Sequence, residues 1–170
     1  MPSTIRLHRV LKTTPDKVYR AFTDADAWCR FLPPHGFLGS IDKFEPKVGG
    51  RFHMSFRNFT TNEAHAFGGE FLELVANRKL AYSDVFDDTN MPGQMKTTIE
   101  LAEVPGGTDV RIVQEGVPDV IPESMCDLGW QDTLTQLRDP VEPDIRQSRT
   151  PKMQRWTRPR TRAALFRWPM

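Results

Sequence analysis

Turn residues recur at hairpin spacing through the central half of the chain, and this pattern most limits the possible folds. Between residues 37 and 115, short apolar stretches alternate with turn sequences such as Val48-Gly49-Gly50 and Pro105-Gly106-Gly107. Such spacing is typical of antiparallel strands joined by short loops. The pattern therefore predicts a meander of six strands, at residues 39–45, 51–57, 65–74, 80–86, 95–103 and 108–115.

A strand and two short helices are predicted before the meander, and one long helix after it. Residues 4–13 alternate with the period of a strand, and Thr14 and Asp24 are typical helix N-caps. Apolar side chains recur at helical spacing over 122–137, which predicts a rod of about 24 Å at 1.5 Å per residue. Gly129 lies inside this helix and suggests a close approach to the structure beneath it.

The order of these elements predicts an α+β fold over residues 1–138. A curved antiparallel sheet would contain seven strands, with the two short helices between the first strand and the other six. The apolar concave face of such a sheet must be covered by another layer. The long C-terminal helix is the expected cover.

Residues 139–170 are predicted to be a poorly ordered tail, basic and rich in Arg and Pro. Eight of the 23 Lys and Arg residues lie in the last 25 positions, which contain no Asp or Glu. Residues 1–145 therefore carry 15 basic and 22 acidic residues, a net charge of −7, and are not expected to bind nucleic acid. Binding of RNA or an acidic membrane by the tail, and an out-of-frame C-terminus, are the alternative interpretations.

Composition also excludes several classes of protein. No run of eighteen residues is apolar enough for a membrane span, and the first ten residues lack the apolar core of a secretory signal. We therefore expect a cytoplasmic protein. Cys29 and Cys126 are too few for a disulfide framework, and the four His residues show no ligand spacing, so no metal or cofactor is expected.

Several short motifs occur in the order seen in a known family, from residue 3 to about residue 137. They are TPDKVYRAFT at 14–23, Trp28, GGRF at 49–52, GEFLE at 69–73, RKL at 78–80, GGT at 106–108 and GWQDTLTQL at 129–137. Together they resemble the START-like, helix-grip superfamily of the birch-pollen allergen, lipid-transfer START domains and polyketide cyclases. Within it, the chain resembles the branch named after the activator of the heat-shock-protein-90 ATPase. Gln114 departs from the pattern, because the family often has His there.

The resemblance implies a cavity between the concave sheet and the last helix. Such cavities are mostly apolar with a few placed polar groups. The side chains expected to line it and bind a ligand are Trp28, Phe52, Met54, Phe56, Phe71, Tyr82, Met95, Thr97, Gln114, Trp130 and Leu134. The alternative is that these bulky residues fill the interior completely.

No catalytic residue is predicted. His65 with Tyr82 or Asp84 could form an acid–base cluster on adjacent strands. A solvated or hydrogen-bonded strand face is the favoured interpretation, because carboxylates on strands are usually exposed and paired. Cys126 is interpreted as a buried thiol rather than a nucleophile, since no Cys/His signature accompanies it.

These observations favour a binding module without catalytic activity, which encloses a hydrophobic or aromatic small molecule beneath the last helix. Two alternatives remain open. The family resemblance implies a co-chaperone that activates the Hsp90 ATPase through its surface, and a polyketide cyclase-like enzyme is the third hypothesis. The chain is expected to be a monomer or a homodimer.

Overall fold

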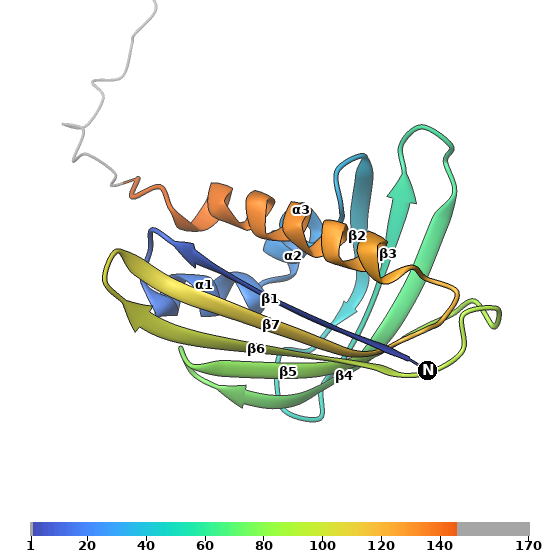
Figure 1. Ribbon diagram of the computed structural model, residues 1–170, viewed down its shortest axis with the longest axis horizontal. Coiled ribbons are helices and arrows are strands. Elements are labelled where there is room, and N and C mark those ends of the chain that lie inside the picture. The colour runs from blue at the N-terminus through green and yellow to red at the C-terminus, as the bar shows by residue number, and fades with distance from the viewer. Residues whose placement is uncertain (1, 146–170) are drawn as a thin grey trace, which may run out of the picture.

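A curved antiparallel sheet wraps around one long helix (Figure 1). The computed structural model describes residues 2–145, in which seven strands and three helices occur. In chain order, they are β1 (Ser3–Leu11), α1 (Pro15–Phe22), α2 (Ala25–Phe31), β2 (Phe37–Phe44), β3 (Arg51–Asn58), β4 (Ala64–Val75), β5 (Lys79–Phe86), β6 (Met95–Val104), β7 (Gly107–Val117) and α3 (Glu123–Val141).

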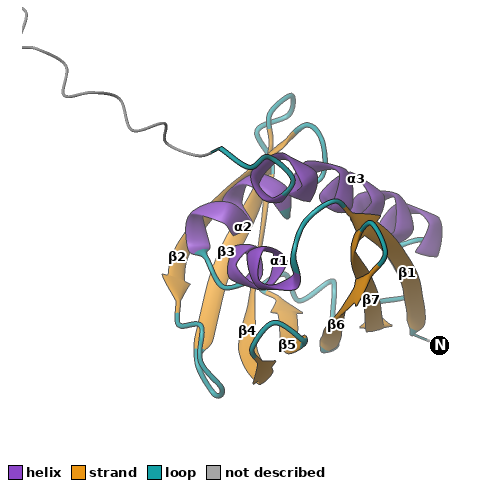
Figure 2. Ribbon diagram, turned by 90° about the vertical axis from the view of Figure 1, so that its left-hand side faces the viewer, coloured by secondary structure: helices purple, strands orange, loops and turns teal. Residues whose placement is uncertain are grey.

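The strands follow the order β1-β7-β6-β5-β4-β3-β2, and every neighbouring pair is antiparallel. The six strands after α2 form a meander, and β1 pairs with the last of them. The two short helices connect β1 at one edge of the sheet with β2 at the other. Figure 2 shows the sheet bent around α3, with α1 and α2 inside the curve. The predicted α+β helix-grip layout is confirmed.

Local sequence signals account for the two short helices. Pro15 occupies the first turn of α1, where its missing amide proton costs nothing. The Asp24 carboxylate caps α2 by accepting a hydrogen bond of 2.9 Å from the Ala27 amide. The two helices pack together through Phe22 and Phe31, whose ring centroids lie 5.1 Å apart.

An aromatic cluster around Trp28 fills one part of the interior. The indole is fully buried, and its Nε1 donates a hydrogen bond of 2.6 Å to the Phe22 carbonyl. Its ring centroid lies 5.1 to 5.8 Å from four other rings, which belong to Phe44, Phe52, Phe71 and Tyr82. Each such pair adds about 0.5–1.5 kcal/mol beyond area burial, so this cluster holds α2 against the sheet.

The last helix packs unequally along its length. Leu134, Leu137 and Val141 are buried in its second half, whereas Met125 and Leu128 are exposed in its first half. Because Val141 continues the i, i+4 spacing of Leu137, the helix extends beyond the predicted residue 137 and past Pro140.

Polar contacts from both sides hold the second half of α3. Arg9 on β1 donates hydrogen bonds to Gln131 and Thr135, at 2.6 and 2.8 Å. The Thr133 hydroxyl donates to the Leu32 carbonyl at 2.8 Å. Within residues 2–145, no helix has the length and apolarity needed to cross a membrane. Most of the predicted tail, residues 146–170, lies outside the described residues.

Candidate functional site

A cavity of about 240 Å³ lies between the concave face of the sheet and the first half of α3. Every strand from β3 to β7 contributes to its wall, together with α3 and the loops that follow α2 and precede α3. The lining residues are Leu32, Pro34, Phe56, Phe67, Tyr82, Asp84, Phe86, Met95, Gln114, Ile121, Met125, Cys126, Gly129, Trp130 and Thr133.

The sheet side of the cavity is mainly aromatic. Alternate residues of a strand share one face, and this places Tyr82, Asp84 and Phe86 of β5 toward the interior. Phe67 on β4 lies between Phe56 and Phe86, with ring centroids 4.9 and 6.1 Å away at steep angles. These edge-to-face contacts fix the wall without help from a ligand.

A short hydrogen-bond chain joins the helix side of the cavity to the sheet. Trp130 Nε1 donates to Gln114 Oε1 at 2.9 Å, and Gln114 Nε2 donates to Thr97 Oγ1 at 3.4 Å. The first bond orients the indole on α3 toward β7. Because an amide has no titratable proton in the physiological range, Gln114 provides this contact at any pH at which the chain folds.

Asp84 is the only carboxylate that lines the cavity within the described chain. It is 5% exposed, and its Oδ1 makes no hydrogen bond to any residue between 2 and 145. Burial raises the pKa of this carboxyl from 3.8 to about 7, because desolvation penalises the charged form. The site therefore contains one readily ionised carboxyl group in a mostly apolar cavity.

Two other titratable groups line the cavity, and both stay neutral near pH 7. Burial raises the pKa of the Tyr82 hydroxyl above 10.0, and the nearby Asp84 charge raises it further. Burial also raises the pKa of the Cys126 thiol above 9.0, with a smaller contribution from Glu123. Cys126 is therefore not an activated thiolate.

The structure separates the predicted lining residues into two groups. Phe56, Tyr82, Met95, Gln114 and Trp130 line the cavity. The other six are buried in the surrounding core: Trp28, Phe52, Met54, Phe71, Thr97 and Leu134. Part of the division comes from Trp28, because Phe52 and Phe71 pack against its indole in the part of the interior next to α2. A role for either group in ligand binding stays a prediction.

Asp84 was expected on a solvated or hydrogen-bonded strand face. Its side chain is buried and its Oδ1 makes no hydrogen bond within residues 2–145, so this interpretation was wrong for Asp84. The signal that could have found it is its parity with Tyr82, since residues two apart on a strand share a face. His65, by contrast, is exposed on β4 and does not line the cavity. The structure therefore does not bring the three residues of the possible acid–base cluster together.

Gly129 is not required by a close backbone approach, contrary to the sequence-based interpretation. A Cβ atom at this position would lie 3.8 Å from Pro34 Cγ, an ordinary van der Waals distance. Gly129 instead contributes to the cavity wall, where its missing side chain leaves space. Cavity-facing residues in the loops, such as Pro34 and Ile121, carry no sequence signal of their position.

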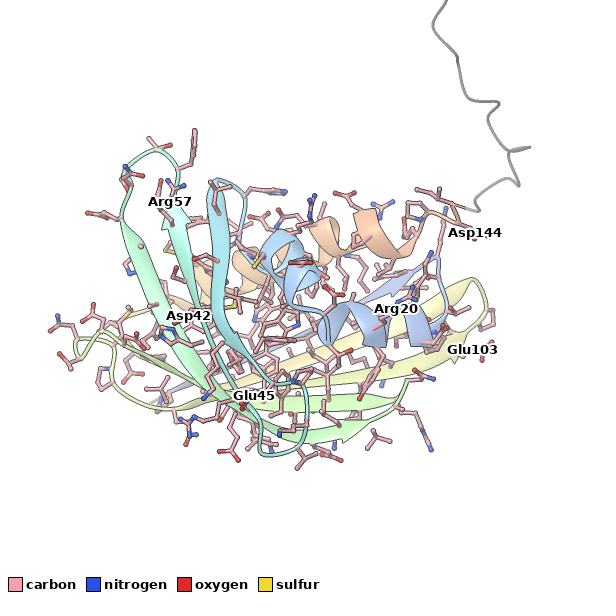
Figure 3. All side chains as sticks on the ribbon, turned by 180° about the vertical axis from the view of Figure 1, so that it is seen from behind. Arg20, Asp42, Glu45, Arg57, Glu103 and Asp144 are labelled. Atoms are coloured by element: carbon pink, nitrogen blue, oxygen red, sulfur yellow. The ribbon has the colours of Figure 1, made fainter. Side chains whose placement is uncertain are left out.

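No metal site is formed by the described residues, since no three His, Cys, Asp or Glu side chains between 2 and 145 gather closely enough to hold an ion. His53, on the outer side of β3, forms a small polar cluster with Asp42 and Asp87. Its ring nitrogens lie 2.7 Å from Asp42 and 2.8 Å from Asp87. Asp42, labelled in Figure 3, exposes 73% of its side chain, so this cluster lies outside the cavity.

The sequence profile of the family described as "Activator of Hsp90 ATPase homolog 1-like protein" matches residues 12–142. This range includes α1, α2, the meander and α3. The chain belongs to this family. Its membership confirms the family resemblance inferred from the short motifs. A comparison with curated proteins finds no match.

Solved structures share the fold of this family member. Protein CV1439 from Chromobacterium violaceum is 51% identical, with a TM-score of 0.83, and the match covers 85% of this chain and all of that one. An AHSA1-like protein from Aeromonas hydrophila is 21% identical, with a TM-score of 0.65 and coverage of 80% and 90%. A protein from Rhodobacter sphaeroides is 18% identical, with a TM-score of 0.71 and the same coverage. The last two show the fold alone.

Proposed function

We propose that this chain binds a hydrophobic or aromatic small molecule in the cavity beneath α3. The observation that carries the proposal is the aromatic enclosure of about 240 Å³, whose shape is set by side-chain contacts within the protein. An engineered apolar cavity of about 150 Å³ binds benzene. The cavity therefore has room for a ligand with one ring and a short chain, or with two small rings.

The apolar wall would provide most of the affinity. Removal of apolar surface from water stabilises a complex by about 25 cal/mol per Å². Phe56, Tyr82, Met95 and Trp130 would contact the body of the ligand, and Gln114 would provide a polar contact. Because no convergent acid–base pair lines the cavity within residues 2–145, the arrangement supports binding rather than catalysis.

Ethylbenzene binding, measured by isothermal titration calorimetry, tests this proposal. We expect saturable one-to-one binding to the natural protein. Gly129→Leu would place a side chain in the cavity and should weaken binding at least tenfold. Ser124→Leu adds the same side chain at an exposed position of the same helix and should leave the affinity unchanged. Equal binding by both variants would contradict the location, and no binding to the natural protein would contradict the function.

Native mass spectrometry of the protein purified from cells provides an independent check. A small molecule retained by the natural protein, and absent from Gly129→Leu prepared in the same way, would identify the physiological ligand. The matched preparation of Ser124→Leu controls for adhesion to the surface of the helix.

Family membership favours a second candidate, stimulation of a chaperone ATPase through the surface of the domain. This activity would not need the cavity. The test is the ATPase rate of the host chaperone with and without the chain. Stimulation by Gly129→Leu as strong as by the natural protein would assign the activity to the surface, and no stimulation at micromolar protein would remove the candidate.

A further inference from the structure

The Asp84 carboxylate has no positive partner in the cavity. Of the residues between 2 and 145 that line it, none is Lys, Arg or His. Asp84 Oδ1 is buried and makes no hydrogen bond within the described chain. Burial of an unpaired carboxylate is costly unless a cation or a hydrogen-bond donor compensates it. The uncompensated oxygen therefore defines the chemistry that a ligand must bring.

The aromatic wall and the carboxylate favour the same kind of ligand group. A cation near the face of Trp, Tyr or Phe is attracted by the ring, and the cavity contains five such rings: Phe56, Phe67, Tyr82, Phe86 and Trp130. An ammonium group also donates charge-assisted hydrogen bonds to a carboxylate, which are about twice as strong as neutral ones. An anionic ligand would be repelled by Asp84.

We propose that the cavity binds a small aromatic or alkyl amine, whose ammonium group donates a hydrogen bond to Asp84 while its apolar body lies against Trp130 and the phenylalanine rings. This inference rests on the proposed function and specifies its ligand class. Gln114 Oε1 already accepts a hydrogen bond from Trp130, whereas Asp84 Oδ1 accepts none within the described residues, so Asp84 is the acceptor that most needs the ammonium group.

The proposal predicts that amine affinity depends on pH. Asp84 must be ionised to pair with an ammonium, and its pKa near 7 means that the ionised fraction rises about tenfold between pH 6 and pH 8. The other titratable groups that line the cavity, Tyr82 on β5 and Cys126 on α3, have raised pKa values and remain protonated throughout this range. Alkyl amines also stay protonated between pH 6 and pH 8, because their pKa values are about 10.

Three probes of matched size separate the contributions of charge and apolar contact. They are 2-phenylethylamine, 2-phenylethanol and ethylbenzene, which present an ammonium, a hydroxyl and a hydrogen to the same position. Calorimetric titrations at pH 6 and pH 8 would use the natural protein, Asp84→Asn and Asp42→Asn. Asp42 is the control, because its carboxylate is exposed on the outer side of the sheet.

At pH 8, the amine should bind the natural protein at least tenfold more tightly than either neutral probe. Its affinity should fall about tenfold at pH 6, where Asp84 is mostly protonated. Asp84→Asn should lose the amine preference and its pH dependence but keep its affinity for ethylbenzene, which also shows that the variant is folded. Asp42→Asn should behave as the natural protein.

Two results would overturn the inference while leaving the proposed function intact. In the first, the alcohol or the hydrocarbon binds as tightly as the amine. In the second, Asp84→Asn retains the amine affinity of the natural protein. If none of the three probes binds the natural protein, both the inference and the proposed function are refuted.

Discussion

Replacement of Asp84 by Asn should stabilise the folded state, relative to the natural protein, increasingly as the pH rises. The Asp84 carboxyl has a pKa of about 7 in the folded protein, against 3.8 for an exposed carboxyl. Because the folded-state pKa is raised, the folded state keeps a proton that the unfolded state loses between these values. The free energy of unfolding of the natural protein therefore falls, relative to Asp84→Asn, as the pH rises from about 4 to about 7.

The size of this change follows from the pKa shift. A difference of about three pKa units, at about 1.4 kcal/mol per unit, makes the relative loss about 4 kcal/mol by pH 8. Urea unfolding at pH 4, 5, 6, 7 and 8 would measure this loss, as the difference in free energy of unfolding between Asp84→Asn and the natural protein. Leu128→Ala is the control and should show no such rise, since the substitution is at an exposed position and changes no titratable group. A difference for Asp84→Asn that stays constant with pH would refute the reasoning.

Three further substitutions test other parts of the structure. Gly129→Ala should raise the free energy of unfolding by up to about 1 kcal/mol, because a methyl group fits beside Pro34 and favours helix; a loss in urea unfolding would contradict this. Trp130→Ala should lower the free energy of unfolding by about 3–5 kcal/mol, because the indole is buried and hydrogen-bonded. Leu128→Ala, at an exposed position of the same helix, should change it by less than about 0.5 kcal/mol. Equal losses in the two variants would count against the packing described for α3. Hydrogen bonds to Asp87 and Asp42 raise the pKa of His53 above 6.5, so its stabilising effect is present below pH 6.5 and is lost as the pH rises through the folded-state pKa. Natural protein and His53→Gln should therefore converge in unfolding free energy between pH 6 and pH 9, and a gap that is independent of pH would disprove this role.

The fold could be predicted because its local signals agree with one another. Strand alternation, turn glycines and helix caps each identify an element from neighbouring residues, and β3 begins at Arg51 as the Gly49-Gly50 turn predicts. The ends of helices and strands were harder to predict where burial, rather than a turn residue, determines them. Val141 is an example, since its contact with the core extends α3 past Pro140.

The cavity could be predicted only in part, because its extent depends on packing between distant segments. Nothing near Trp28 in the sequence indicates that its ring meets Phe52 and Tyr82, and this contact decides which part of the interior is filled. Asp84 was misplaced for a different reason. Its strand parity indicated the inner face, but the usual exposure of carboxylates indicated the outer face, and in this strand the parity decides.

The unequal packing of α3 has a consequence for the kinetics of ligand exchange. The half of the helix that covers the cavity exposes Met125 and Leu128, whereas Leu137 and Val141 anchor the other half in the core. A local opening that frays the first turns would leave those anchors in place and costs less than global unfolding. Such fraying would widen the access to the cavity, so that the rates of ligand uptake and release could change without a change in overall stability.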